Sequence, residues 1–229
     1  VFVIDADEWL EDPAETVQKI RRAVEEAVAE DKRTISCLVK SYTGKHSHWQ
    51  TRLYKTRHLG QSTGIHWKGD VHNYLSHTGD FRSSQTVIVY AGYSDTHTKD
   101  PDRALRMLKK AVADNPNAVR EVYYLAREYW YKGKLEEAVT ECQKYLSRAK
   151  WLPEIADAYL IMARCLWHLR RGEEARRACL QAINCNANFK EAILFMAEMS
   201  WPDNKKRWIE FAQTATNKGV LFVRETVIK

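Results

Sequence analysis

The chain has 229 residues, 45% hydrophobic and 29% charged, which is enough for one large or two modest domains with a real core. No apolar run approaches the roughly 20 residues that cross a bilayer, so a membrane span is excluded, and the acids directly after Val1–Ile4 argue against a secretory signal. The net charge of +6 comes from residues 99–229, which hold 24 Lys/Arg against 17 Asp/Glu, whereas residues 1–98 hold 12 against 13.

The five cysteines are odd in number and contain no C-x-x-C pair. This usage argues against a zinc site and favours reduced thiols in the cytoplasm. We expect most of them to be buried as small apolar side chains.

The first part of the chain has the pattern of a mixed α/β fold. Asp12 and Pro13 predict the cap and first position of a helix that continues to about Ala29, with an apolar face of Val17, Ile20, Val24, Ala27 and Val28. Strands are predicted at Val1–Ile4, Ile35–Tyr42, Thr51–Thr56 and Thr86–Tyr90. Between the last two, Gly60–Gly79 is predicted as mostly loop, with a short extended piece near Trp67–His72.

Paired acids directly follow the first predicted strand, in the sequence Asp5-Ala6-Asp7-Glu8. Two carboxylates one residue apart at a strand end suit a divalent cation such as Mg²⁺ or Mn²⁺. The alternative is that these acids only lead from the strand into the helix. Lys32–Lys68 contains eight basic residues and no acid, which suits an anionic ligand or, equally, a solvated loop.

From about residue 99 the pattern is helical and repetitive. Leu135-Glu136-Glu137-Ala138 matches Gly172-Glu173-Glu174-Ala175, 37 residues later, and the turns Lys132-Gly133-Lys134 and Arg170-Arg171-Gly172 precede them. Two antiparallel helices with small residues at their crossing resemble the tetratricopeptide repeat over about residues 101–216. The alternative is an ordinary helical bundle. Tyr129, Trp130, Trp151 and Trp167 are interpreted as packing residues.

The front part, in its order of motifs, resembles family 2 glycosyltransferases of the GT-A type that carry tetratricopeptide-like repeats after the catalytic domain. The matching elements are V-F-V-I-D-A-D-E-W-L, Arg52-Leu53-Tyr54-Lys55, Trp67-Lys68-Gly69-Asp70-Val71-His72 and Ala91-Gly92-Tyr93. The resemblance implies an α/β part, a partial GT-A-like mixed sheet, followed by an all-α helical-repeat array. The implied domains are residues 1–98, the repeats at 99–218, and a tail or strand at 219–229.

The same resemblance implies roles for individual residues. Asp5, Asp7 and His72 would hold Mn²⁺ or Mg²⁺ against the diphosphate of a nucleotide-sugar donor, a UDP-sugar being the first expectation. Asp70 or Glu8 would be the general base, and Arg52, Lys55 and Trp67 would contact substrate. Asn73 stands where the family has Glu, and the family's nucleotide-binding half is missing. We therefore expect a segment of a longer protein, or a partner chain that supplies this half.

Three functions follow for testing. The leading one is a metal-dependent glycosyltransferase whose repeats dock an acceptor or a partner protein. The rival is a non-catalytic repeat scaffold for protein interaction. The third is a glycosyltransferase acting on modified nucleic-acid bases, which the basic second half permits.

Overall fold

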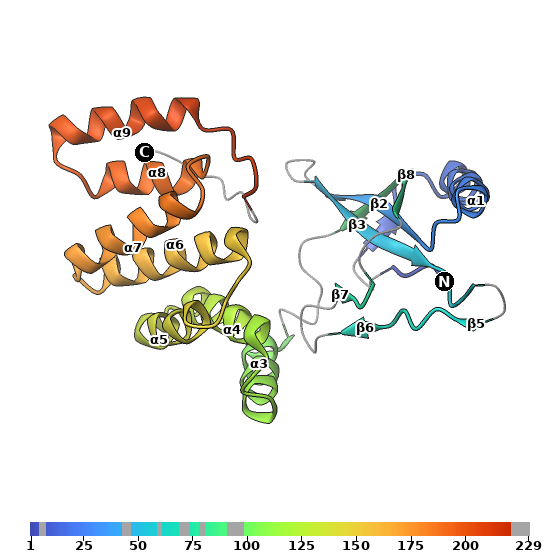
Figure 1. The fold of residues 1–229 in the computed structure, drawn as a ribbon, viewed down its shortest axis with the longest axis horizontal. Helices are drawn as coiled ribbons and strands as arrows, with labels where there is room; N and C mark the ends of the chain where they lie inside the picture. Colours follow the sequence, from blue (N-terminus) through green and yellow to red (C-terminus); the bar gives the residue numbers. More distant parts are fainter. Residues whose placement is uncertain are drawn as a thin grey trace. The chain divides into compact units, whose positions relative to one another are not determined.

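The chain forms two units, Val1–Arg103 and Ala104–Lys229, and each is described by itself. The computed structural model describes residues 1–4, 8–42, 47–58, 61–68, 74–77, 81–90 and 99–220 (Figure 1). None of the helices within these ranges combines the length and apolar character that crossing a bilayer requires.

A four-stranded mixed sheet is the centre of the first unit. Its strand order is β1-β8-β2-β3, in which β2 and β8 are parallel and the other neighbours are antiparallel. The strands span Glu8–Leu10 (β1), Phe81–Tyr90 (β8), Thr34–Ser41 (β2) and Ser47–Tyr54 (β3). Two small ribbons accompany the sheet, namely β4 (Arg57–His58) with β5 (Gln61–Ser62), and β6 (Trp67–Lys68) with β7 (Tyr74–Leu75). A small mixed sheet is thus present, but it does not by itself identify a GT-A-like architecture.

The first residues of the chain lie along β3. Phe2 forms an isolated antiparallel bridge with Leu53, and the backbone N–H of Val3 donates to the carbonyl of Arg52 at 2.9 Å. The predicted strand Val1–Ile4 is therefore reduced to a single bridge among the described residues. The predicted strands at Thr51–Thr56 and Thr86–Tyr90 start earlier than expected, because β3 and β8 gain further ladder pairs with β2.

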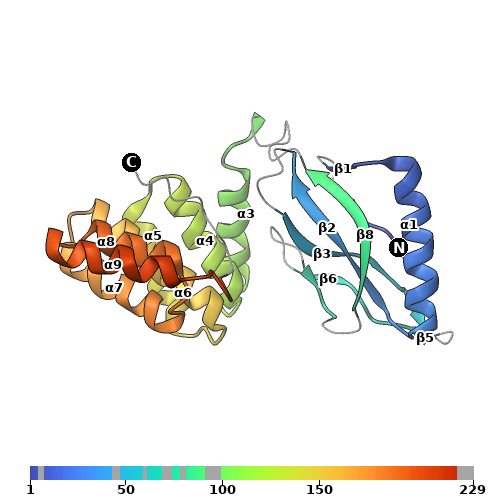
Figure 2. The same ribbon diagram turned by 90° about the horizontal axis from the view of Figure 1, so that it is seen from above.

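Helix α1 (Pro13–Ala29) begins as predicted. Asp12 is its N-cap, and its carboxylate accepts from the backbone N–H of Glu15 at 3.0 Å. The helix packs on β8 and β2 (Figure 2). Its buried residues are Thr16, Ala23 and Ala27, and Ile20 packs against the core. The predicted face is therefore right for Ile20 and Ala27 and wrong for the three valines. Val17, Val24 and Val28 are 46%, 39% and 56% exposed.

The core of this unit lies between α1 and the sheet. It is formed by small helix residues and branched strand residues, namely Ala23, Ala27, Ile35, Cys37, Val39, Leu53 and Ile88. The helix comes close to the strands because alanine, rather than the valines, faces them.

The second unit is an array of helices. They span Arg103–Asp114 (α3), Val119–Tyr131 (α4), Leu135–Leu146 (α5), Leu152–His168 (α6), Gly172–Cys185 (α7), Lys190–Glu198 (α8) and Pro202–Thr214 (α9). The predicted crossing residues Ala138 and Ala175 have no exposed surface, as do Ala126 and Ala163 on the preceding helices. This burial confirms a helical repeat in which small residues let paired helices approach closely.

The two predicted turns differ in which residue makes them. Gly133 has a φ of 69°, as a left-handed turn residue should. In the next repeat the left-handed position is Arg170, with a φ of 63°, which is 37 residues later. Gly172, which the sequence pattern suggested as the turn glycine, is instead the first residue of α7.

Candidate functional site

Two of the predicted site residues of the first unit form a buried ion pair. A guanidinium N–H of Arg52, on β3, donates to a carboxylate oxygen of Glu8, at the start of β1, and another contact of the same nitrogen reaches Gln50 at 2.9 Å. The side chains of Arg52 and Glu8 are 2% and 6% exposed. A general base or a phosphate contact at these positions would first have to open this pair.

Lys55 and Trp67 lie elsewhere in the first unit. The backbone of Lys55 donates to the carbonyl of Arg33, and its side chain is half-buried. Trp67 is also half-buried, with its ring edge-to-face with Tyr54 at 6.4 Å between centroids. Trp67 thus packs its ribbon against the end of β3, whereas Lys55 pairs with the residue before β2.

The structure does not describe the residues that were predicted to bind the metal ion, nor one of the two candidate general bases. Asp5, Asp7, Asp70 and His72 lie outside the described residues, so the cation site and the role of Asp70 stay predictions. Within the described ranges, no group of three His, Cys, Asp or Glu side chains is arranged to hold a metal ion.

In the repeat unit, rings and guanidinium groups form one continuous series of contacts, which we call the arginine–aromatic row. Its members, in contact order, are Trp151, Arg120, Tyr124, Arg127, Tyr131, Trp130, Arg164 and Phe195. The guanidinium-to-ring distances along it run from 5.2 to 5.9 Å, and the rings of Trp130 and Tyr131 are 5.1 Å apart. Such contacts fix the orientation of each guanidinium over an aromatic face.

Buried acids form ion pairs and hydrogen bonds with residues of this row and with the tyrosines next to it. Arg164 donates to Glu191 at 2.7 Å, and Arg120 lies 3.6 Å from Glu154. Tyr123 donates to Asp157 at 2.7 Å, while Tyr145 donates to Glu154 at 2.8 Å. The three acids are at most 4% exposed, and Tyr124 and Phe195 of the row are buried with them. Tyr131 and Trp151 of the row are exposed, and Arg120 and Arg164 reach the solvent in part.

Burial has a measurable consequence at Glu154. Loss of solvent raises the pKa of its carboxyl above the ordinary value, and the hydrogen bond from Tyr145 together with Arg120 and Arg127 offsets only part of this rise. At least one acid that contacts the row, Glu154, is therefore harder to ionise in the folded chain than in the unfolded chain.

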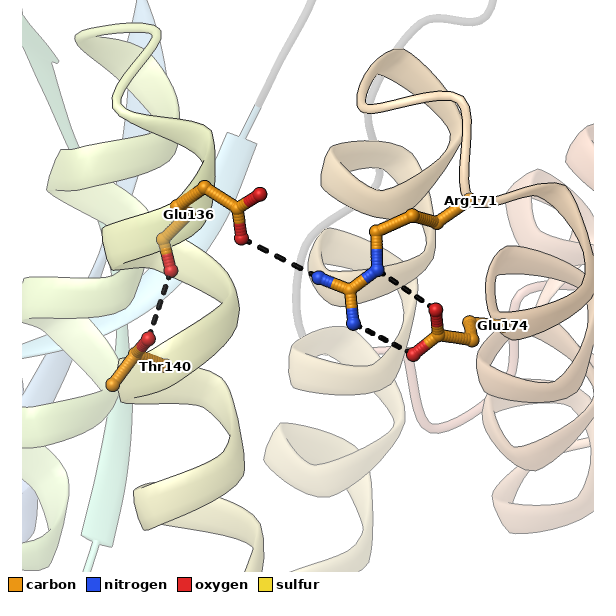
Figure 3. Close-up of polar contacts among 4 residues, drawn as sticks. All are labelled: Glu136, Thr140, Arg171 and Glu174. Carbon is orange, nitrogen blue, oxygen red and sulfur yellow. Dashed lines mark hydrogen bonds and ion pairs between the residues drawn. The ribbon is translucent and has the colours of Figure 1, made fainter.

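A second network joins the turns of successive repeats (Figure 3). Arg171, in the turn before α7, contacts Glu174 through two N–H groups at 2.8 and 2.7 Å and reaches Glu136 of α5 at 3.4 Å. Thr140 donates to the backbone carbonyl of Glu136 at 3.0 Å. Arg171 thus places the α4–α5 turn beside the α6–α7 turn.

The sequence reading overlooked the row, although a signal for it exists. Arg127 and Arg164 are 37 residues apart, as are Glu154 and Glu191, and this is the repeat spacing already found for the alanines. Trp130 and Trp151, interpreted as packing residues, take part in the row, and Trp151 is 49% exposed.

Comparison with known proteins supports the repeat architecture. Residues 98–150 and 123–189 match the family model of the tetratricopeptide repeat. The helical array over these residues is therefore of the tetratricopeptide type. No curated protein matches the chain significantly.

Several solved structures of MamA are similar to the chain. One crystal structure is 22% identical, covering 56% of this chain and 74% of that chain with a TM-score of 0.41. A structure titled MamA AMB-1 is 20% identical, covering 53% and 72%, with a TM-score of 0.45. Another, titled MamA MSR-1, is 19% identical, covering 54% and 70%, with a TM-score of 0.43. At these values the likeness carries no inference about function.

The prediction that the protein is an enzyme, a glycosyltransferase, is wrong. The family match falls on tetratricopeptide repeats, stacked helical units that offer an extended binding surface rather than reacting groups. The nucleotide-sugar donor and the transfer to modified bases lose their basis with it. The front-unit motifs suggested this chemistry because a pattern as short as D-x-D also arises by chance.

Proposed function

We propose that the protein is a non-catalytic scaffold whose repeat array binds a segment of a protein partner on the arginine–aromatic row. The single observation that supports this proposal is the row itself, which runs across α4, α6 and α8 within and beyond the tetratricopeptide match. Arginine and aromatic residues are the types enriched at binding hot spots.

The geometry favours a segment that meets side chains held in advance. Arg120 and Arg164 are each held by a ring and by a buried acid, and Arg127 is held by rings and by a hydrogen bond to the Tyr131 hydroxyl, so little side-chain freedom is left to lose on binding. Tyr131 and Trp151 are 56% and 49% exposed, and they offer apolar area at the two sides of Arg120 and Arg127.

Selection of peptides from a random display library on the whole chain tests the proposal. We expect enriched peptides whose binding is reduced at least roughly ten-fold by Tyr131→Ala with Trp151→Ala, since each is an exposed aromatic anchor. The matched control is Leu180→Ala with Phe211→Ala, exposed apolar residues on α7 and α9 that lie off the row. Failure to enrich any peptide, or equal loss in both double variants, would reject this function.

A further inference from the structure

A second surface follows the turns between paired helices, and it shares Trp130 and Tyr131 with the arginine–aromatic row. We call it the turn edge and define it as residues 130–137, 167–177 and 199–207. Two contacts show that these turns lie next to one another. Arg171 reaches Glu136 at 3.4 Å, and Arg176 reaches the backbone carbonyl of Met199 at 3.5 Å. Figure 3 shows the first of these contacts.

Every turn on this edge presents an exposed ring. Tyr131 and His168 are the last residues of α4 and α6, and both are exposed, Tyr131 to 56%. Trp201, directly before α9 in the third turn, is 83% exposed. Single exposed apolar residues are common on protein surfaces and need no explanation. A ring that recurs at each of three neighbouring turns does need an explanation, because an exposed tryptophan contributes little to the stability of the fold.

Each ring is followed by cations. Lys134 comes shortly after Tyr131, Arg170 after His168, and Lys205, Lys206 and Arg207 after Trp201, and all five are exposed. Residues 130–137, 167–177 and 201–207 together hold nine Lys/Arg against five Asp/Glu. Of those acids, Glu136 and Glu174 are held by Arg171 and Glu173 is held by Arg176. The edge is therefore positive, and most of its carboxylates are already engaged.

From this combination we propose that the turn edge binds single-stranded nucleic acid, without sequence preference. Proteins with this activity join cations that contact phosphates to aromatic side chains on which bases stack, and every base has a face for such stacking. Tyrosine, histidine and tryptophan are the ring types used. Each nucleotide of a single strand carries both a phosphate for a cation and a base for a ring, which matches the repeated pairing of rings and cations along the edge, so charge and rings together favour the nucleic acid.

This proposal is tested by measuring the affinity of the whole chain for a labelled oligothymidylate of twelve nucleotides by fluorescence anisotropy. Trp201→Ala should weaken binding roughly ten-fold, the effect expected for loss of one stacked base. Lys205→Gln, Lys206→Gln and Arg207→Gln combined should make the slope of log affinity against log salt shallower by about 2, since each phosphate contact on a single strand contributes about 0.7. Trp201 is too exposed for its loss to harm the fold, and thermal melting checks this.

Matched controls separate the edge from the row and from general charge. Lys109→Gln, Lys150→Gln and Lys190→Gln remove the same charge from exposed positions off the edge and should leave the salt slope unchanged. Trp151→Ala, on the row, should leave oligothymidylate binding intact. The proposal is overturned if the oligothymidylate does not bind, if the two triple variants behave alike, or if a polyglutamate peptide or phosphatidylserine vesicles bind through these residues in its place.

Discussion

Arg52 shows what burial does to a charged residue that looks available in the sequence. It lies within an R-x-x-K strand pattern, yet its guanidinium is 2% exposed and paired with Glu8. Removing two charges from water costs several kcal/mol per ion, and the cost is repaid only while both partners remain in place. The pair is thus part of the structure of the first unit, and it links the start of β1 to β3, the strands at the two edges of the sheet.

Removing one member of this pair should therefore cost more than removing both. Arg52→Ala is expected to lower the free energy of unfolding by about 3–5 kcal/mol, because Glu8 is left as a buried, unpaired charge. Arg52→Met combined with Glu8→Leu should recover most of that loss. Urea denaturation of the single and double variants measures the difference. If the double variant is as unstable as the single one, the pair is not the source of the cost.

The contribution of Glu154 to stability should depend on pH. Because burial raises the pKa of its carboxyl in the folded chain, the folded state binds its proton more tightly than the unfolded state does. This residue's contribution to stability is consequently lost as pH rises from the ordinary carboxyl value of 4.5 through the raised one. Stability at this site should be greatest on the acid side of that window.

Glu154→Gln removes the titration while keeping the shape and an acceptor for Tyr145. The difference in unfolding free energy between the parent chain and this variant should shift in favour of the variant as pH rises from 4.5 to 7. Denaturation at several pH values measures this difference, with Glu137→Gln, an exposed glutamate on α5, as the control that should show no such trend. A difference independent of pH would contradict the raised pKa.

At the scale of elements, the sequence predicted most where a local rule and the tertiary packing agree. The Asp12 cap and Pro13 fixed the start of α1, and the 37-residue spacing located the alanines that are buried where helices pair. The predicted face of α1 was right for Ile20 and Ala27 but wrong for the three valines, because the pattern weighs hydrophobicity alone, whereas the helix turns Ala23 and Ala27 to the sheet. The edges of β3 and β8 depend on pairing with β2, which no local pattern contains.

The candidate site was predictable only in part for the same reason. The repeat spacing of Arg127 with Arg164 was visible, but the row depends on which rings the folded helices bring over each guanidinium. The sequence likewise could not show that Glu8 and Arg52, 44 residues apart, neutralise one another.

The α6–α7 turn contains a backbone strain that the α4–α5 turn avoids. Arg170 has a φ of 63° at the position where the preceding repeat has Gly133. A left-handed conformation costs a non-glycine residue about 1–2 kcal/mol, which glycine does not incur, although glycine loses more entropy on folding. Arg170→Gly should thus stabilise the array by about 0.5–1 kcal/mol.

The reciprocal change, Gly133→Ala, has open space around the new Cβ, so only its φ of 69° opposes it. It should destabilise the array by about 1 kcal/mol. Opposite shifts in the urea midpoints of these two variants are the expected result. A loss of stability in Arg170→Gly would mean that the arginine side chain, rather than its backbone, governs this turn.

At the scale of the whole molecule, the two units are built on separate groups of core residues. The core of the first unit draws on residues between Ala23 and Ile88, and that of the second on residues of α3 to α9. Each of the two cores contains buried cysteines. As expected from the sequence, they are buried small side chains in four of five cases: Cys37 in the first unit and Cys142, Cys165 and Cys179 in the second, with Cys185 half-buried.

Thiol reactivity should therefore follow the unfolding of each unit separately. Burial raises the pKa of Cys37 to about 11 and those of Cys165 and Cys179 to about 12, and also raises the pKa of Cys142, so all four are protonated and shielded at pH 8. In the native chain, Cys185 should react first with a thiol reagent, and the other four should react only when their unit opens.

Chains with two cores need not unfold in one step. Labelling at increasing urea, followed by mass spectrometry of peptides, should give one midpoint for Cys37 and a different, common midpoint for Cys142, Cys165 and Cys179. A common midpoint for the three is expected because helices of neighbouring repeats share interfaces and open together. Coincidence of all four midpoints would contradict independent cores, and separate midpoints for the three repeat cysteines would show that the array unravels repeat by repeat.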